Sequence, residues 1–345
     1  MSRCVITVVT ASHLPAAIVM AKSVREYDSS VALIIVVIDI SQENLQKYVL
    51  PGADNLLFVG GDLLQDKLLE NARAYYSAFE LCCSAKPFAL CYALSELGYE
   101  KAIYLDSDIL CYDSLEYAWN SLNQNDFILT PHVMSPCTSH PTLPSEWELM
   151  NQGFMNAGFI GVRQGEAGSK ILEWLKTKCI HFGFNCMPYM FVDQPWVSST
   201  AWVFPFHVQS LLHAGMNVAY WNLHERQITM RQAQLYSNED RLVFFHFSGF
   251  ESKHPDQLTK YQIRSQSAAQ LQLLLPLQRD YAARLEQARL AMPKLTPDFP
   301  CNTGSLYARM RAYRRVHAKP QHFAERAILS EISLKAAALW RKLRR

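Results

Sequence analysis

Two aspartates, Asp106 and Asp108, follow a short apolar run at residues 103–105 and are separated by one residue. The run is typical of a buried strand, and alternate strand positions point to the same side. Two carboxylates this close repel each other unless a cation lies between them, and hard oxygen ligands suit Mg²⁺ or Mn²⁺. The pair therefore predicts a divalent-metal site that bridges the protein to a substrate diphosphate. The alternative is a solvated loop or a helix cap; a calcium EF-hand loop is not expected, because Leu110 and Cys111 stand where it needs an oxygen ligand and Gly.

A second apolar run, residues 242–247, contains His246 near its end and is followed by Ser248 and Gly249. A neutral imidazole there would be a third metal ligand, and mixed oxygen and nitrogen ligation favours Mn²⁺ over Mg²⁺. The backbone N–H groups of the small turn, together with Lys253, would suit a phosphate. The alternative is a histidine of the apolar core.

Three further segments carry polar groups at places where chemistry is possible. Asn156 precedes a strand and would bond a sugar hydroxyl, and Gly158 would allow close backbone approach; a turn that satisfies its own backbone is the alternative. Asp193 and Gln194 form a polar step that also suits a helix cap before a proline. Lys86 would pair with an acid or a phosphate, or lie on the surface at the start of a helix.

The order of elements predicts an α/β protein. We expect strands at residues 4–10, 31–40, 56–59, 103–105, 127–130, 154–162 and 242–247. We expect helices at 16–25, 41–48, 169–179 and across 63–97, the last interrupted near Lys86 and Pro87. This alternation predicts a mostly parallel central sheet covered by helices on both faces, that is, a Rossmann-like three-layer sandwich.

Composition narrows the function classes. The chain has 345 residues, of which 50% are hydrophobic, enough for a large core. Its nine cysteines include no Cys-x-x-Cys pair, which favours free thiols in a reducing cytoplasm over a zinc site. No stretch approaches the roughly 18 to 20 apolar residues of a membrane-spanning helix. The sequence has no P-loop, Gly-x-Gly-x-x-Gly or Gly-x-Ser-x-Gly motif, so nucleotide hydrolysis, dinucleotide redox chemistry and serine hydrolysis have no signal.

The C-terminal part differs from the rest. After residue 255 the strand signals end, so we divide the chain into a catalytic domain at 1–255 and a helical region at 256–345. Residues 309–345 hold eleven Lys or Arg and two Glu, and from Ile328 onward the apolar residues share one helical face that includes Trp340. A basic amphipathic helix of this kind predicts contact with an anionic membrane, with packing on the body or on a second subunit as the alternative. No nucleic-acid partner is expected, because interleaved stacking aromatics are missing.

Four motifs in this order resemble glycosyltransferase family 8 of the GT-A fold, which includes bacterial lipooligosaccharide galactosyltransferases and glycogenin. They lie at residues 104–110, 154–159, 193–194 and 246–249, and the resemblance covers roughly residues 1–255. The first strand, with Thr7 and Thr10, and the Lys86–Pro87 step are also similar. The resemblance implies a metal-dependent enzyme that moves a sugar from a nucleoside diphosphate sugar, in the first place a UDP-sugar, with retention of anomeric configuration.

The resemblance also implies roles for individual residues. Asp106, Asp108 and His246 would bind Mn²⁺ or Mg²⁺, and Asp193 and Gln194 would lie beside the sugar and the acceptor as the catalytic pair. The donor-binding residues would be Thr10 and Ala11 for the nucleoside, Lys86 and Ser107 near the donor, Asn156, Ala157 and Gly158 for the sugar, and Gly249 and Lys253 for the diphosphate. From the basic tail and the cysteines, and not from the resemblance, we expect a glycan or lipid-linked saccharide as the acceptor and a cytoplasmic protein that is peripheral on the inner face of the membrane.

The chain departs from the family pattern in two places. Lys253 lies one residue further from Gly249 than the family spacing, and Pro195 replaces a frequent Asp.

Two other functions remain open at this point. One is a haloacid-dehalogenase-like phosphatase, with Asp106 as the nucleophile and Asp108 as the acid-base group. The other is a nucleotide-sugar-binding protein without turnover.

Overall fold

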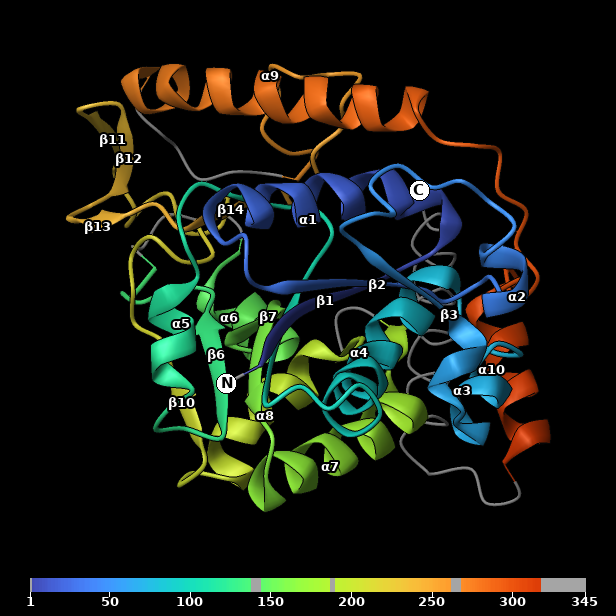
Figure 1. Cartoon of the computed structure of the whole chain (residues 1–345). Helices are drawn as coiled ribbons and strands as arrows, with labels where there is room; N and C mark the ends of the chain where they lie inside the picture. Colours follow the sequence, from blue (N-terminus) through green and yellow to red (C-terminus); the bar gives the residue numbers. More distant parts are fainter. Residues whose placement is uncertain (1, 138–143, 187–189, 262–267, 318–345) are drawn as a thin grey trace, which may run out of the picture.

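The centre of the molecule is a seven-stranded sheet in the order β10-β6-β7-β4-β1-β2-β3. The structure is a computed structural model that describes residues 2–137, 144–186, 190–261 and 268–317. All strand pairs of this sheet are parallel except those of β7, which runs antiparallel to β4 and β6 (Figure 1). The strands are β1 (Arg3–Val9), β2 (Ala32–Val37), β3 (Leu57–Gly60), β4 (Lys101–Leu105), β6 (Phe127–Pro131), β7 (Met155–Arg163) and β10 (Val208–Ser210). The prediction of a mostly parallel α/β sheet is confirmed.

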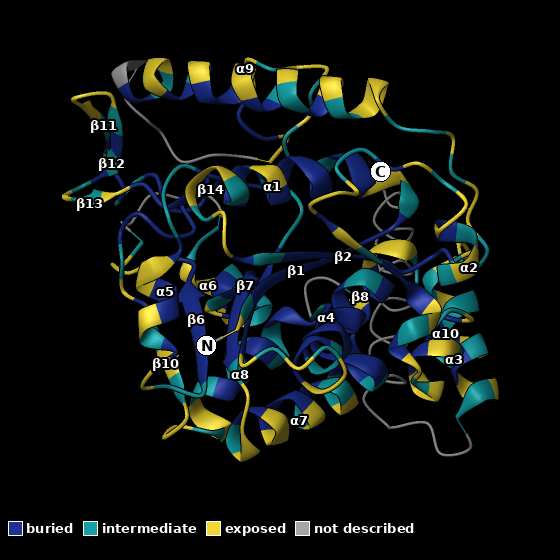
Figure 2. Cartoon of the chain, in the orientation of Figure 1, coloured by how far each residue is buried: buried dark blue, intermediate teal, exposed yellow. Residues whose placement is uncertain are grey.

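Helices cover both faces of this sheet, because its central strands are apolar on both sides. The helices α4 (Ala78–Ser95) and α7 (Glu166–Phe182) pack on one face and α1 (Leu14–Tyr27) on the other, which gives three layers. Alternate residues of β1 enter opposite cores: Ile6 belongs to the first core and Val5 to the second. In Figure 2 the central strands β1, β4, β6 and β7 are almost entirely dark, whereas the outer helices are buried only on their inner sides.

The remaining elements are short. They comprise the helices α2 (Gln42–Leu45), α3 (Lys67–Ala72), α5 (Glu116–Ser121), α6 (Glu146–Gln152) and α8 (Gln194–Val203), and the 3-10 turns η1 (Ala11–His13) and η2 (Gly61–Leu64). Outside the main sheet, β5 (Ile109–Cys111) pairs with β14 (Phe244–His246), β8 (Asn185–Cys186) with β9 (Met190–Phe191), and β11 (Ile228–Arg231) with β12 (Gln234–Ser237) and β13 (Asp240–Arg241). All nine cysteines are free thiols; four of them are buried, and the other five are half-buried.

The prediction for residues 63–97 placed the interruption of the helix at the wrong residues. The chain is interrupted at residues 73–77, and α4 then runs without a break through Pro87. The start of α4 is set by a capping box, in which Ser77 and Glu80 each bond the other's backbone N–H. Lys86 therefore lies in the middle of a helix, on the side that faces the sheet, and is 3% exposed instead of lying on the surface.

The C-terminal region packs against the body at two places. The helix α9 (Ala268–Leu290) lies along α1, and its Tyr281 stacks on Phe247. The helix α10 (Leu306–Val316) places Tyr313 in the core beside Tyr75. Among the described residues, no helix is both long enough and apolar enough to cross a membrane. The amphipathic helix predicted from Ile328 onward lies outside the described residues.

Candidate active site

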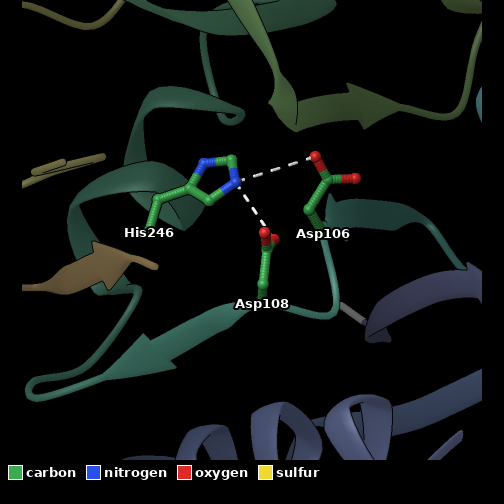
Figure 3. A group of neighbouring side chains, drawn as sticks. All are labelled: Asp106, Asp108 and His246. Carbon is green, nitrogen blue, oxygen red and sulfur yellow. Dashed lines mark ion pairs between the residues drawn. The ribbon is translucent and has the colours of Figure 1, made fainter. Parts of the chain in front are cut away.

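The two aspartates and the histidine predicted as metal ligands lie together at the carboxyl edge of the sheet. After β4 the chain turns at residues 106–108 and enters β5, and β14 pairs with β5 so that His246 lies opposite Ile109. The imidazole Nε2 is 3.0 Å from Asp108 Oδ1 and 4.0 Å from Asp106 Oδ2 (Figure 3). One ligand atom from each residue lies within 4.8 Å of the other two. Two carboxylates and one imidazole around a common point form a donor set that suits Mn²⁺.

The charges of this cluster depend on one another. Partial burial alone would raise the pKa of Asp108, but the adjacent imidazole outweighs it and lowers that pKa. Burial opposes protonation of His246, but Asp108 and, more weakly, Asp106 outweigh it and raise the pKa of the imidazole. Together with the 3.0 Å distance from Nε2 to Asp108 Oδ1, these shifts favour a proton on His246 Nε2 between the carboxylates when no cation is bound there. Because a metal needs the same nitrogen, metal binding should release this proton.

Lys86 provides a buried positive charge beside the metal cluster. Its Nζ lies 3.2 Å from Asp106 Oδ1 and 3.2 Å from Asp193 Oδ2, and it donates a hydrogen bond to Ala157 O at 2.9 Å. Burial disfavours the charged ammonium, but the two carboxylates outweigh it and raise the pKa of Lys86 well above its usual range. Burial raises the pKa of Asp193, and Lys86 opposes this rise. Lys86 therefore joins the metal cluster to the residues before α8.

Asp193 and Gln194 lie at the start of α8, as the sequence predicts. Asp193 occupies the N-cap position, but its side chain makes no capping hydrogen bond and turns toward Lys86. The capping interpretation of Asp193 was therefore wrong, because the buried cation attracts the carboxylate more strongly than the helix end does. Gln194 is 5% exposed; its Oε1 accepts from Ala157 N–H at 3.3 Å and its Nε2 donates to Gln152 O at 3.1 Å.

A chain of buried amides determines which nitrogen of His246 faces the carboxylates. The backbone N–H of Gly158 donates to Asn156 Oδ1 at 3.0 Å, so this oxygen is an acceptor. Asn217 Nδ2 must then donate to the same oxygen at 3.1 Å, which leaves Asn217 Oδ1 facing His246 Nδ1 at 3.2 Å. His246 therefore carries a proton on Nδ1 and presents Nε2 to the metal position. The sequence interpretation missed Asn217, although one fully buried amide in the apolar run 214–219 was a signal.

The same network continues on the other side of Asn156. Its Nδ2 donates to His132 Nε2 at 3.1 Å and to Gln194 Oε1 at 3.2 Å. His132 must then donate from Nδ1 to Phe154 O, which lies 3.2 Å away. Burial lowers the pKa of His132 to about 4, so the ring is a neutral acceptor at neutral pH. Asn156 therefore does both: its Oδ1 accepts from the backbone N–H of Gly158, as a turn residue does, and its side chain also joins Asn217, His132 and Gln194.

Gly158 is needed for space at this junction. A Cβ atom added there would lie 2.6 Å from His246 Cε1 and 2.9 Å from Asp106 Oδ2. The close approach predicted at Gly158 is therefore present, and the groups that approach β7 there are the side chains of the metal cluster. Whether Asn156, Ala157 and Gly158 also hold a donor sugar stays a prediction.

The residues predicted to bind the nucleoside lie at the end of β1. Thr10 is 5% exposed, and Ala11 N–H donates to Asp39 Oδ1 at 2.8 Å. Thr10, Ala11 and Asp39 line a pocket of about 750 Å³. Asp39 was not predicted, although it follows the apolar run 31–38 in the same way as Asp106 follows its strand.

The residues predicted to bind the diphosphate have fewer contacts with the metal cluster. Gly249 has a φ of 72°, and an added Cβ would lie 2.5 Å from Tyr261 Cε2, so the turn after β14 requires glycine. Lys253 is exposed on a following turn, and Ser107 lies between the two metal-cluster aspartates. Their contacts with a diphosphate stay predictions.

The hydrogen-bond chain through Asn217 is testable on metal binding alone. An Asn217→Leu protein should bind Mn²⁺ roughly 10- to 100-fold more weakly, as is typical when a partner that orients a ligand is lost. Asn217→Asp should keep much of the affinity, because a carboxylate still accepts from His246 Nδ1, but it can no longer donate to Asn156. Titration calorimetry gives the affinities, and the ¹⁵N shifts of His246 report the protonated nitrogen. Equal Mn²⁺ affinities and equal shifts in Asn217→Leu and the unmodified protein would show that the network does not orient the ligand.

Comparisons with known proteins give two relatives and several solved structures. No family model matches the chain. The uncharacterized proteins YfnF and YfnD of Bacillus subtilis (strain 168) are 24% and 25% identical, over 71% of this chain and 80% and 76% of theirs. Similar solved structures include mouse xyloside xylosyltransferase 1, with a TM-score of 0.41 and 13% identity over 71% of this chain and 97% of that chain.

Two bacterial structures are similar to the same degree. The glycosyltransferase GlyE of Streptococcus pneumoniae TIGR4 has a TM-score of 0.47 and 13% identity, over 86% of this chain and 66% of its own. The galactosyltransferase LgtC, in complex with donor and acceptor sugar analogs, has a TM-score of 0.45 and 15% identity over 85% of this chain and 97% of its own. These values are too low to carry function from one chain to the other, so the function is argued from the site.

Proposed function

We propose that this protein is a metal-dependent glycosyltransferase that moves a sugar from a nucleoside diphosphate sugar, most simply a UDP-sugar, to a glycan or glycolipid acceptor. The observation that supports it is the convergence of Asp106, Asp108 and His246 at the carboxyl edge of a mostly parallel sheet. Ligands of open α/β sheets bind at this edge. A nucleoside-sized pocket opens at the same edge, beside Thr10 and Asp39.

The proposed chemistry is loss of a diphosphate from the anomeric carbon. Asp106, Asp108 and His246 would hold Mn²⁺ or Mg²⁺, which when bound stabilises the negative charge that develops on the leaving diphosphate. Lys86 adds a fixed positive charge beside the same carboxylates, and Asn156 and Gln194 form a rigid floor for the sugar. Asp193 is 1% exposed and paired with Lys86, which favours a positioning role over attack on the sugar. Retention of configuration stays part of the proposal, supported by the sequence resemblance.

Fewer observations support the proposed acceptor. A glycolipid or other lipid-linked acceptor fits the basic composition of residues 309–345. In the described part of this segment, α10 carries Arg309, Arg311, Arg314 and Arg315. Contact with an anionic membrane surface is the partner proposal that follows.

The proposal is tested by thermal unfolding with metal and nucleotide together. Mn²⁺ with UDP should raise the melting temperature more than either alone, because a ligand that binds only the folded state stabilises it by about 2.7 kcal/mol at one hundred times its dissociation constant. The metal effect should weaken as pH falls, because a proton competes with the metal for His246 Nε2, whose pKa is raised. UDP release from UDP-glucose or UDP-galactose in the presence of acceptor-rich extract then separates a transferase from a binding protein without turnover.

An unchanged melting temperature with Mn²⁺ and every nucleoside diphosphate tried would contradict the proposal. The phosphatase alternative receives no support from the structure. Its second acidic motif would have to come from Gly61 and Asp62, and Asp62 instead caps α2 by accepting from Gln42 N–H at 2.7 Å.

A further inference from the structure

The pocket beside Thr10 and Asp39 is built by two parts of the chain that are far apart in sequence. Its inner wall comes from the ends of β1 and β2 and from the start of α4. Its outer wall comes from residues 292–303, which connect α9 to α10 and which we call the strap. In Figure 1 the strap descends from the end of α9, past α2, toward α10. A pocket of about 750 Å³ lies within the usual range for small-ligand sites.

The strap is fastened on both sides of the pocket. On one side, the N–H groups of Asp298 and Phe299 donate to Asp39 O at 2.9 and 3.0 Å, and Asp298 Oδ2 accepts from Ser41 N–H and Oγ–H at 2.8 and 2.7 Å. On the other side, Asn302 bonds the backbone that leads into α4: its N–H donates to Tyr76 O at 3.0 Å and its Nδ2 to Ala74 O at 2.7 Å. These hydrogen bonds therefore hold the strap across the pocket, opposite the inner wall.

The lining combines apolar walls with one acceptor. The strap contributes mainly apolar residues, namely Met292, Pro293, Leu295, Pro297, Phe299 and Pro300. Phe79 lines the pocket from α4 and is 49% exposed, so part of an aromatic ring is open to a ligand. The Asp39 carboxylate is 6% exposed, and burial raises its pKa.

Asp39 still has acceptor capacity for a ligand. Apart from its own backbone N–H, Ala11 N–H is the only group among the described residues that donates to the Asp39 carboxylate, and it binds Oδ1. A carboxylate has about four lone-pair positions, so Oδ2 can accept from an N–H or a hydroxyl in the pocket. An apolar pocket with an aromatic ring and a carboxylate acceptor in its lining suits a heteroaromatic ring that carries N–H groups or an attached sugar with hydroxyls.

The pocket lies at a suitable distance from the metal cluster. Neighbouring strands are about 4.8 Å apart, and β1 and β2 are the first and second strands beyond β4. The ends of β4 and β2 are therefore separated by about 10 Å, which is comparable to the extent of a nucleoside from its base to its first phosphate. A diphosphate at Asp106 and Asp108 would place an attached nucleoside between Asp39 and the strap.

We propose that the strap is the outer wall of a nucleobase site, with Phe79 and the apolar strap residues packing on the base and Asp39 accepting from the base or the ribose. This inference rests on the proposed function, because it places the nucleoside of the same donor. It assigns part of donor recognition to the region after residue 255.

The experiment compares UDP with inorganic pyrophosphate, each titrated with Mn²⁺ by calorimetry. Phe79→Ser should weaken UDP binding roughly 10-fold, since stacking of one base on an aromatic ring is typically worth that much or more. Asp298→Ala, which removes the side-chain bonds of the strap to Ser41 and so loosens one end of it, should also weaken UDP binding several-fold. Both variants should bind pyrophosphate as the unmodified protein does. Phe206→Ser is the matched control, because Phe206 is 93% exposed and lies just before β10, the strand at the opposite edge of the sheet.

The outcomes separate the two proposals. If the unmodified protein binds UDP, and Phe79→Ser and Asp298→Ala bind it equally well, the strap is not part of the nucleobase site. Equal losses for UDP and pyrophosphate would also overturn the inference, because the base would then contribute nothing. If the unmodified protein binds neither UDP nor pyrophosphate with Mn²⁺, the proposed function itself is wrong. Circular dichroism melting of each variant shows whether it remains folded.

Discussion

An Asp108→Ala protein is expected to lose at least about 100-fold of its transfer rate, the usual effect of removing one preorganised electrostatic group from an active site. Asp108 Oδ1 lies 3.0 Å from His246 Nε2, so the carboxylate and the imidazole face the same metal position. Asp106→Ala should have an effect of at least the same size, because Asp106 also pairs with Lys86. The rate is measured as UDP release and product formation at saturating Mn²⁺.

The matched control for this prediction is Asp113→Ala. Asp113 lies shortly after β5 and pairs with exposed Arg241 at 3.5 Å, away from the metal cluster. The control should keep its activity and its Mn²⁺ affinity. Full activity of Asp106→Ala or Asp108→Ala in the presence of metal would refute the metal assignment.

A Lys86→Met protein is expected to be less stable by about 3–5 kcal/mol, the range for removal of one partner from a buried ion pair. The side chain of Lys86 is 4% exposed and that of Asp193 is 2% exposed, so the lost charge leaves Asp193 uncompensated in the interior. Adding Asp193→Asn to Lys86→Met should recover part of the loss, because the buried anion is then removed. Urea unfolding of the metal-free proteins measures both values.

Lys101 offers a matched control for the second prediction. It is also buried, but its Nζ donates to Trp119 O at 3.2 Å and to Asn123 Oδ1, so it compensates no carboxylate. Lys101→Met should therefore cost only about 1–3 kcal/mol, the usual cost of leaving buried polar groups unpaired. If both lysine variants lose the same free energy of unfolding, the pairing of Lys86 with Asp106 and Asp193 is not what makes Lys86 important.

The sheet was predictable because its strands are continuous apolar runs buried on both faces. Residues 31–40 and 103–105 carry this pattern, and the structure places β2 and β4 there. Strand direction was not predictable, because a buried run looks the same in both directions; the reversal of β7 becomes visible only in its pairing with β4 and β6. The continuous α4 was missed because Pro87 normally breaks a helix, whereas here the packing against the sheet keeps the helix intact.

The site was predictable where polar residues end apolar strands. Asp106, Asp108 and His246 follow that rule, and the structure brings them together. The environment of Lys86 was not predictable, because its burial depends on α4 lying against β4 and β7. Asn217 and His132 were missed for the same reason: each contacts the site only through residues distant in sequence. The division at residue 255 stays a prediction, although α9 and α10 both pack on the body before it.

The pairing of β5 with β14 has a consequence for how the protein is made. The two strands are distant in sequence, yet only their pairing brings His246 to the aspartates. During synthesis, therefore, no emerging chain offers a complete ion site until His246 has left the ribosome and reached its partner strand. An ion that binds only this closed arrangement would stabilise this long-range contact, and it should slow the opening of the folded chain more than it speeds its formation.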